Sequence, residues 1–381
     1  MTPSRRRQFG VEEEYLLLDA KTGRPTDHAA ALIRSLPDHR ESADREFFAS
    51  QLETATPVCE DAAEAEAILT EFRAEASSAA VPLGIVMAGT GLPPVGGDEP
   101  GTVTPKERYR MIRAEVRSAA DHQYVTGTHV HIEVPSRDAG ADVLQRLARW
   151  APALMALTAN SPIWCGEPTG FASWRYIMGL NWPISGYPPE FSNGDEYTRA
   201  VERLISTGVL IDSGAVTWLA RLSHNFPTIE LRIADAQLEP RDAVDFATVL
   251  RAIVDQGLRD AEAGIEPPRI LPGLVNGAIW LAARNGLGSE VVDPLHGEAI
   301  PAFALLERMV DIHEATLSAF GDLDRVQGYL DRLRRQGSPA ARQVARHPML
   351  VRTGSCYSPR LNMGRSIPRS AAVRIASSYP A

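Results

Sequence analysis

The chain has 381 residues, of which 44% are apolar and 23% charged, as in globular proteins with a substantial core. Its formal net charge of −9 argues against nucleic acid or an anionic membrane as partner, and no apolar run approaches the ~20 residues that span a bilayer. Cys59, Cys165 and Cys356 are scattered without paired spacing, which suits a reducing, cytoplasmic compartment and gives no zinc-site signal.

Predicted strands and helices alternate through the first part of the chain. Residues 9–19, FGVEEEYLLLD, predict a strand even though adjacent glutamates are poor strand formers that repel one another. A helix is expected around residues 28–36, an extended segment over 47–58, and an amphipathic helix over 61–80. A strand over 83–90 should follow.

Two stretches without clear periodicity interrupt this pattern. The Gly/Pro-rich segment 91–105 is long for a simple connection, and such loops often act as mobile lids over a site. After a predicted strand at 127–134 and a helix over 141–160, residues 161–197 are rich in Gly, Pro and aromatic side chains. We expect this second stretch to be an irregular insert over a site.

The remainder of the chain is predicted to be mainly helical. Residues 228–235, TIELRIAD, predict one more strand, and a long helix should begin at Pro240. Beyond Pro267 we expect helices to about Arg346, followed by a basic, irregular tail. Strands dispersed among long helices without regular βαβ spacing favour an α+β fold, and the absence of a clear linker favours one catalytic domain over residues 1–381.

Alternation of side chains along a strand divides each predicted strand into two faces. Glu13 shares its face with Val11 and Tyr15, and we expect it to be structural. Lysine is almost absent from the polar positions, which is unusual for a face that is merely solvated. The polar positions are Glu12, Glu14, Gln51, Glu53, His129, His131, Glu133, Glu230 and Arg232.

If these strands pair in one sheet, their polar side chains line a single surface. Carboxylate oxygens with histidine suit Mg²⁺, or Mn²⁺ in its place, bridging a phosphate, and Arg232 could bind a phosphate or carboxylate. The alternative for any single strand is an ordinary solvated face. His129 and His131 also resemble a zinc pair, but no third nitrogen or sulfur ligand stands at a useful spacing.

Several segments occur in a characteristic order: FGVEEEYLLLD, QLETATPVC, TPKERYRMI, GTHVHIEVP, the aromatic insert with FASWRYI, and TIELRIADAQ. Together they resemble the glutamate–cysteine ligase type 2 family, also called carboxylate–amine ligases. The resemblance runs from about Phe9 to Leu287, with a weaker match in WLAARNGLGS and ARQVARHPMLVRTG. It implies a glutamine-synthetase-like fold, in which an antiparallel sheet curves around a cleft and is backed by helices.

The resemblance also implies an activity. Members couple ATP to amide formation by phosphorylating a carboxylate, usually the γ-carboxylate of glutamate, which cysteine or another amine then attacks. The substrates are therefore expected to be small molecules, and a homodimer is an expectation at the level of the family. The acceptor amine cannot be named from the sequence.

Positions in the family motifs carry the expected roles. Glu12 and Glu14 match paired Mg²⁺ ligands, and Glu53 and Glu230 match further ligands. His129 matches a histidine near the nucleotide phosphates and is a further metal-ligand candidate. His131 and Arg232 are candidates for binding the nucleotide, and Arg232 and Arg175 are candidates for catalysis. Glu133 is a candidate of lower rank.

Three other functions remain open from the residues themselves. A guanidino kinase shares the sheet architecture and would phosphorylate a guanidine without releasing phosphate. A zinc hydrolase would use His129 and His131. A binding protein without catalysis is the third alternative. Four carboxylates argue weakly against it: Glu12, Glu14, Glu53 and Glu230.

Overall fold

The computed structural model describes residues 6–39 and 42–350, and the expected basic tail lies outside these residues. Over the described residues the strands form a seven-stranded antiparallel sheet in the order β2-β3-β1-β5-β9-β8, with β4 paired to the end of β1. Two small hairpins, β6-β7 and β10-β11, stand apart from it. The strands are β1 (Phe9–Asp19), β2 (Ala43–Arg45), β3 (Gln51–Ala55), β4 (Ile85–Ala88), β5 (Gly127–Glu133), β6 (Ile163–Trp164), β7 (Glu167–Pro168), β8 (Ala220–Leu222), β9 (Thr228–Asp235), β10 (Glu290–Asp293) and β11 (Glu298–Pro301).

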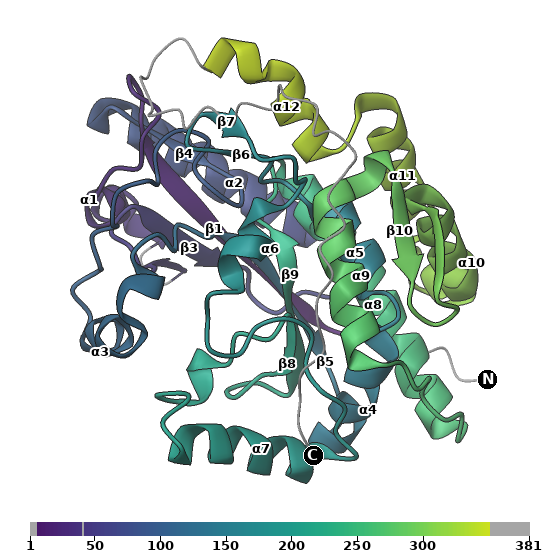
Figure 1. Cartoon of the computed structure of the whole chain (residues 1–381). Helices are drawn as coiled ribbons and strands as arrows, with labels where there is room; N and C mark the ends of the chain where they lie inside the picture. Colours follow the sequence, from purple (N-terminus) through teal and green to yellow (C-terminus); the bar gives the residue numbers. More distant parts are fainter. Residues whose placement is uncertain (1–5, 40–41, 351–381) are drawn as a thin grey trace, which may run out of the picture.

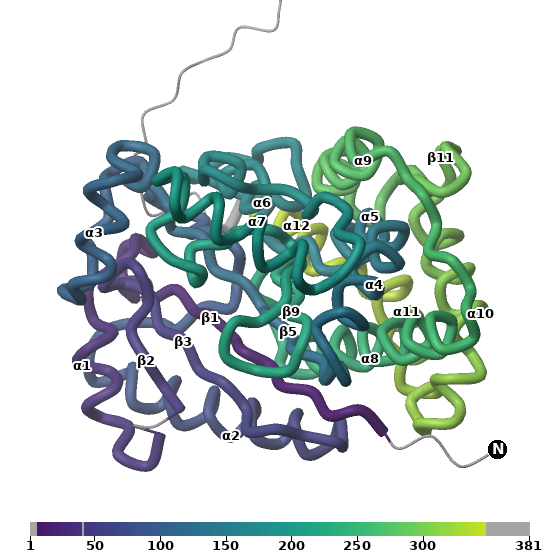
Figure 2. The backbone as a smooth tube through the Cα atoms, turned by 90° about the horizontal axis from the view of Figure 1, so that it is seen from below, coloured from purple at the N-terminus to yellow at the C-terminus, as the bar shows by residue number. Residues whose placement is uncertain are grey.

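Helices lie on both sides of this sheet (Figures 1 and 2). Along one side run α2 and α8, which pack against each other and against the strands, whereas α3, α6 and α7 lie on the other side. The helices are α1 (Ala29–Arg34), α2 (Ala62–Ala80), α3 (Glu107–Val116), α4 (Arg137–Leu147), α5 (Ala151–Thr158), α6 (Trp174–Gly179), α7 (Gly194–Ser206), α8 (Pro240–Glu262), α9 (Pro272–Asn285), α10 (Ala302–Phe320), α11 (Leu323–Gln336) and α12 (Pro339–Leu350).

The helix expected from Pro240 is confirmed as α8, and it organises the core behind the sheet. Its predicted apolar stripe is buried, and the helix contacts β1, β5, α2, α4 and α10. Burial of such a stripe against β-branched strand residues is what holds one face of the sheet in place. The stripe comprises Val244, Ala247, Leu250, Ile253 and Val254.

Glu13 lies on the buried, helix-facing side of β1, where its negative charge is paired with an arginine. Arg73 of α2 donates hydrogen bonds to both carboxylate oxygens of Glu13, at 2.5 and 3.0 Å, and the Tyr15 hydroxyl donates to the same carboxylate. The guanidinium also donates to the carbonyl oxygens of Gln237 and Leu238, which follow β9. A buried carboxylate with this many donors is structural, and the predicted division of β1 into two faces is confirmed.

One expected helix is two. The segment 141–160 was expected to be continuous, but α4 ends at Leu147 and α5 begins at Ala151. Pro152 lies in the first turn of α5, where its missing N–H costs nothing. Further inside a helix the same ring would clash with the carbonyl of the residue four before it, so the helix stops ahead of it.

The expectation of a mainly helical chain beyond Pro267 is confirmed, and the β10-β11 hairpin is an addition that the sequence did not predict. Asp293, at the end of β10, is fully buried, and its carboxylate pairs with Arg149 at 3.3 Å and with Arg308 at 2.8 Å. Partners so distant in sequence cannot be read from local periodicity.

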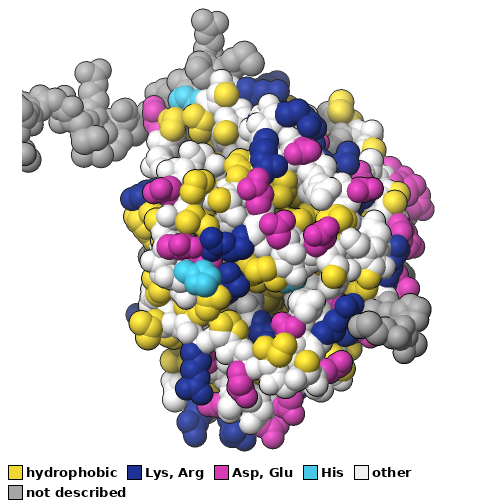
Figure 3. All heavy atoms as spheres, turned by 90° about the vertical axis from the view of Figure 1, so that its right-hand side faces the viewer, with side chains coloured by type: hydrophobic (Ala, Val, Ile, Leu, Met, Phe, Trp, Pro, Cys, Tyr) yellow, Lys and Arg dark blue, Asp and Glu magenta, His cyan; other side chains and the backbone are white. Residues whose placement is uncertain are grey.

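One face of the surface agrees with the charge analysis. On the face shown in Figure 3, basic and acidic side chains are interspersed and form no extended basic area. None of the helices in the described part of the chain is both long enough and apolar enough to cross a membrane.

The contribution of buried ion pairs in the helical layer to stability can be tested at Arg251. Its fully buried guanidinium lies between the rings of Phe9 and Phe320 and donates to Asp322 at 2.5 Å. Replacement by Met leaves Asp322 without this partner, so Arg251→Met should lower the free energy of unfolding by about 3–5 kcal/mol in chemical denaturation.

The matched control is Arg334→Met. Arg334 is more than a third exposed and pairs with exposed carboxylates, so its loss should cost less than about 1 kcal/mol. Equal losses in the two variants would contradict a special role for the buried pair.

Candidate active site

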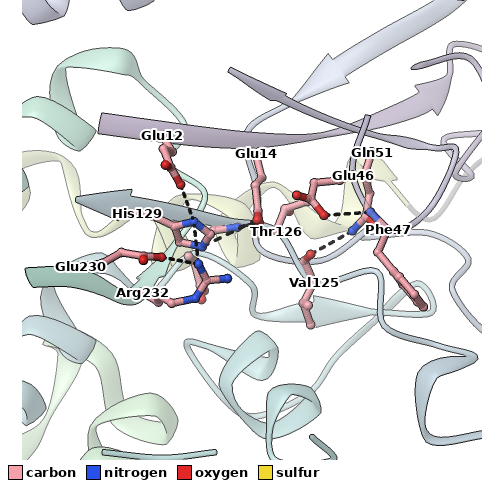
Figure 4. Close-up of polar contacts among 12 residues, drawn as sticks. Glu12, Glu14, Glu46, Phe47, Gln51, Val125, Thr126, His129, Glu230 and Arg232 are labelled. Atoms are coloured by element: carbon pink, nitrogen blue, oxygen red, sulfur yellow. Dashed lines mark hydrogen bonds and ion pairs between the residues drawn. The ribbon is translucent and has the colours of Figure 1, made fainter. Parts of the chain in front are cut away.

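The polar positions of four neighbouring strands converge on one face of the sheet (Figure 4). The antiparallel register sets Glu12 opposite His129, Glu14 opposite Glu53, and His131 opposite Glu230. Directly opposed side chains of an antiparallel pair have Cβ atoms about 5 Å apart, so the register alone brings these groups together. The expectation that the strands pair in one sheet is therefore confirmed.

The first cluster, the Glu12 group, consists of Glu12, His131 and Glu230, one residue from each of β1, β5 and β9. Each can offer one ligand atom, and these atoms lie within 4.8 Å of one another. His131 Nε2 is buried 3.2 Å from Glu12 Oε1 but without hydrogen-bond geometry. A buried nitrogen without a hydrogen bond, beside two carboxylates, fits a divalent cation.

The second cluster, the Glu14 group, consists of Glu14, Glu46 and Glu53, whose oxygens likewise lie within 4.8 Å of one another. Burial and the neighbouring Glu46 raise the pKa of Glu14 to about 8 and raise that of Glu53 well above its usual range. The negative charge of Glu46 thus disfavours the charged forms of Glu14 and Glu53, and a bound cation would remove this repulsion. The donor set is all oxygen, which suits Mg²⁺ or Mn²⁺.

His129 lies between the two groups. Its Nδ1 is 3.2 Å from Glu12, and its Nε2 is buried 3.7 Å from Glu14 without a hydrogen bond. Burial and the positive charge of Arg232 lower the pKa of His129 to about 4, so the imidazole is neutral at pH 7. A neutral imidazole with an available nitrogen can serve as a ligand or as a hydrogen-bond donor.

Glu230 is the most strongly paired carboxylate of the site. Arg221 binds it through two hydrogen bonds of 2.7 and 2.9 Å, and Arg232 donates to it at 2.5 Å. Burial alone would raise the pKa of Glu230, but these two arginines outweigh burial and lower it to about 2. The carboxylate is therefore ionised at any physiological pH.

Arg175 is a largely buried cation whose positive charge is only weakly compensated by nearby negative groups. Its nearest carboxylate is that of Asp235, at 3.8 Å, one guanidinium nitrogen donates to the Arg232 carbonyl at 3.2 Å, and its Nε has no hydrogen bond. Burial lowers its pKa. Gly127 makes room for it, because a Cβ there would lie 2.4 Å from Arg175 Nη2. Such a side chain is suited to an anion brought by a substrate.

A cavity of about 620 Å³ opens over this face of the sheet. Glu12, the Glu14 group, His129, Arg175 and Arg232 line its floor, and α3 with residues 208–215 and Trp182 forms the facing wall. No residue of 91–105 lines it, so the structure gives the proposed lid loop no contact with the cavity. Glu133 is also outside the lining and accepts a hydrogen bond from the Gln8 backbone N–H.

The structure also brings in residues that the sequence did not single out. Glu46 follows β2, and the pairing of β2 with β3 carries it to Glu53. Arg221 lies on the short strand β8, directly opposite Glu230. Gln123 lines the cavity with its buried Oε1 unpaired. A three-residue strand and a turn carry too little periodicity to have identified them.

Comparisons with known proteins identify the family of the chain. The model of glutamate–cysteine ligase family 2 matches residues 8–358. A Mycobacterium sp. (strain KMS) relative, named "Putative glutamate–cysteine ligase 2-2", is 38% identical over 337 residues, covering 88% of this chain and 92% of its own. A relative from Salinispora tropica, named for the same ligase, is 37% identical over 347 residues, or 91% of each chain.

The solved structures support the fold. Glutamate–cysteine ligase of Francisella tularensis, in complex with AMP, is similar with a TM-score of 0.67 and 14% identity, over 91% of this chain and 87% of that one. The expected α+β, glutamine-synthetase-like fold is thus confirmed, and so is the prediction of an ATP-dependent ligase that forms C–N bonds. The chain belongs to glutamate–cysteine ligase family 2.

Proposed function

We propose that this protein joins the γ-carboxylate of glutamate, or of a closely related acid, to an amine through an acyl-phosphate intermediate. The observation that carries the proposal is the convergence of Glu12, the Glu14 group, His129 and two partly buried arginines, Arg175 and Arg232, on one cavity of about 620 Å³. Reactions between two anions require this combination of cation ligands and fixed positive charge.

The proposed reaction has two steps. In the first, a carboxylate oxygen of the acid attacks the γ-phosphorus of ATP, the bond to the bridging oxygen breaks, and ADP leaves. In the second, the amine nitrogen attacks the acyl carbon, the carbon–oxygen bond to phosphate breaks, and the nitrogen loses a proton. The products are ADP, phosphate and an amide.

The Glu12 group and the Glu14 group would hold divalent cations, Mg²⁺ or Mn²⁺, with His129 between them. A bound cation would offset the negative charge of the phosphates and of the carboxylate that approaches them. All of these ligands except Glu46 stand on strands paired on both sides, so their positions are fixed before substrate arrives.

Arg232 and Arg175 would bind the anionic groups of the substrates. Arg232 lies beside Glu230 and His129, close to the proposed cations, which favours a phosphate contact. Arg175, with its weak compensation by Asp235, favours the carboxylate of the acid or the acyl phosphate. A single catalytic domain, a cytoplasmic location and a homodimer remain predictions.

The first test is phosphate release by the purified protein with ATP and Mg²⁺. Phosphate should appear only when glutamate and an accepted amine are both present, because the amine is needed to release it from the acyl group. A coupled phosphate assay over a panel of amines, with product mass, measures this, and chelation of the metal should abolish it. A phosphorylated guanidine without free phosphate would instead indicate a guanidino kinase.

The second test concerns the two faces of β1. Glu12→Gln should weaken Mn²⁺ binding by more than about tenfold, since even indirect partners of metal ligands contribute on that scale. Glu13→Gln should change Mn²⁺ affinity much less, because Arg73 still holds the carbonyl oxygens after β9, but it should lower the free energy of unfolding by weakening the pair with Arg73. Free Mn²⁺ measured by electron paramagnetic resonance, with chemical denaturation, separates the two. Similar loss of affinity in both variants would refute the division of faces.

The third test concerns Arg175. Arg175→Met should raise the KM for the acid by about tenfold or more, since one charged hydrogen bond to a substrate contributes ~1.5–3 kcal/mol. Steady-state kinetics with acid and amine varied separately measures this. A change confined to the KM of the amine would exclude Arg175 as the acid-binding residue.

A further inference from the structure

Arg175 differs from Arg232 in that it comes from outside the sheet. It lies in the first turn of α6, within the irregular stretch 161–197. A helix of six residues is not stable by itself in water, so contacts outside the helix must fix its position. These contacts are found at the end of β9.

Asp235, the last residue of β9, is fully buried beside the start of α6. Its carboxylate accepts hydrogen bonds from the Asn160 backbone N–H at 2.7 Å and from the hydroxyls of Ser161 and Ser173 at 2.7 and 2.8 Å. Ser161 precedes the β6-β7 hairpin and Ser173 follows it. One carboxylate therefore joins β9 to both ends of this excursion of the chain.

Both serines also bind the helix that carries Arg175. Ser161 Oγ accepts the Arg175 backbone N–H at 2.9 Å, and Ser173 Oγ caps α6 by accepting the Tyr176 backbone N–H at 3.3 Å. A hydroxyl can make both bonds at once, because it donates its one proton to the carboxylate and accepts through its oxygen. The carboxylate thus fixes the direction of both hydroxyls, and the hydroxyls fix the first turn of α6.

The side chain of Arg175 is aligned by the same strand. Its Nη2 donates to the Arg232 carbonyl oxygen at 3.2 Å, and its Nη1 lies 3.8 Å from Asp235 Oδ1. Burial raises the pKa of Asp235, whereas the positive charge of Arg175 acts in the opposite direction. Backbone and guanidinium are therefore both held at the end of β9.

Asp235 itself has little room to move. Gly91 lies so close that a Cβ at that position would be 2.8 Å from Asp235 Cγ. The Asn160 side chain donates to the Ala236 carbonyl oxygen at 2.7 Å and accepts from Gln343 of α12 at 2.6 Å, so the Asn160 backbone is fixed as well. A binding group works best when the residues behind it are locked in this way.

We propose that Asp235 is a positioning residue that acts through two serine hydroxyls to hold Arg175 in the orientation that binds a substrate anion. Asp235 does not line the cavity. The inference rests on the proposed function and deepens it, because it names what aligns one of the anion-binding groups. It does not depend on which substrate carries the anion.

The test removes the two hydroxyls one at a time. Replacing Asp235 would also remove the negative charge nearest to Arg175, so the serine variants Ser161→Ala and Ser173→Ala are more specific. Phosphate release with ATP, Mg²⁺, glutamate and an accepted amine gives kcat and a KM for each substrate. Each variant should raise the same KM that Arg175→Met raises, by about three- to tenfold, since one neutral hydrogen bond contributes on that scale.

The matched control is Ser136→Ala. Ser136 Oγ caps α4 by accepting the Ala139 backbone N–H at 3.1 Å, as Ser173 caps α6, but α4 does not line the cavity. This variant should leave every KM unchanged.

Combination with Arg175→Met separates positioning from a general structural role. In that background, Ser161→Ala and Ser173→Ala should change the affected KM by less than about twofold, because the side chain that they orient is gone. Effects that multiply in the double variants, or a fall in kcat at unchanged KM in the single variants, would overturn the positioning role.

The outcomes also separate this inference from the proposed function. Multiplying effects, or an unchanged KM in Arg175→Met, in an enzyme that releases phosphate would refute the role of Asp235 and leave the ligase function supported. Absence of phosphate release with every amine, in protein that binds Mn²⁺, would overturn both.

Discussion

Repulsion between the clustered carboxylates of the active site is the constraint that the sheet must withstand. Glu14, Glu46 and Glu53 are held with their oxygens within 4.8 Å of one another, where burial and the nearby Glu46 disfavour the ionised forms of Glu14 and Glu53. Such a group would spread apart on a flexible loop. Here two of its members lie directly opposite each other on paired strands, so the strain is maintained by the ladder of backbone hydrogen bonds.

Glu13 and the cavity-side groups differ in how far their buried polar atoms are hydrogen-bonded. On the helix-facing side, Glu13 is fully satisfied by Arg73 and Tyr15, and the layer around it is packed. On the cavity side, imidazole nitrogens and part of the Arg175 guanidinium have no hydrogen bond among the described residues. Satisfied groups stabilise a fold, whereas unsatisfied buried groups mark the places where a ligand is expected to complete the structure.

The sequence predicted the floor of the site better than its walls, for a physical reason. Strand residues alternate with a period of two, so Glu12 could be separated from Glu13, and His129 grouped with His131, without coordinates. Glu46 directly follows a three-residue strand and Arg221 lies on another, where no period can be read, and only tertiary pairing brings them to the site. Pro152 was a readable signal for the end of the expected 141–160 helix, whereas the pairing of Asp293 with Arg149 and Arg308 was not.

Arg73 has a consequence that reaches through the sheet. One guanidinium on α2 binds Glu13 of β1 and the carbonyl oxygens just after β9, the two strands that carry Glu12 and Glu230. The separation of those two carboxylates is thus braced from the reverse side, by a side chain that never meets a substrate. The metal–oxygen distances of Mg²⁺ and Ca²⁺ differ by about 0.3–0.5 Å. The size of the ion accepted between Glu12 and Glu230 would therefore depend on the hydrogen bonds that Arg73 makes on the opposite face of the sheet.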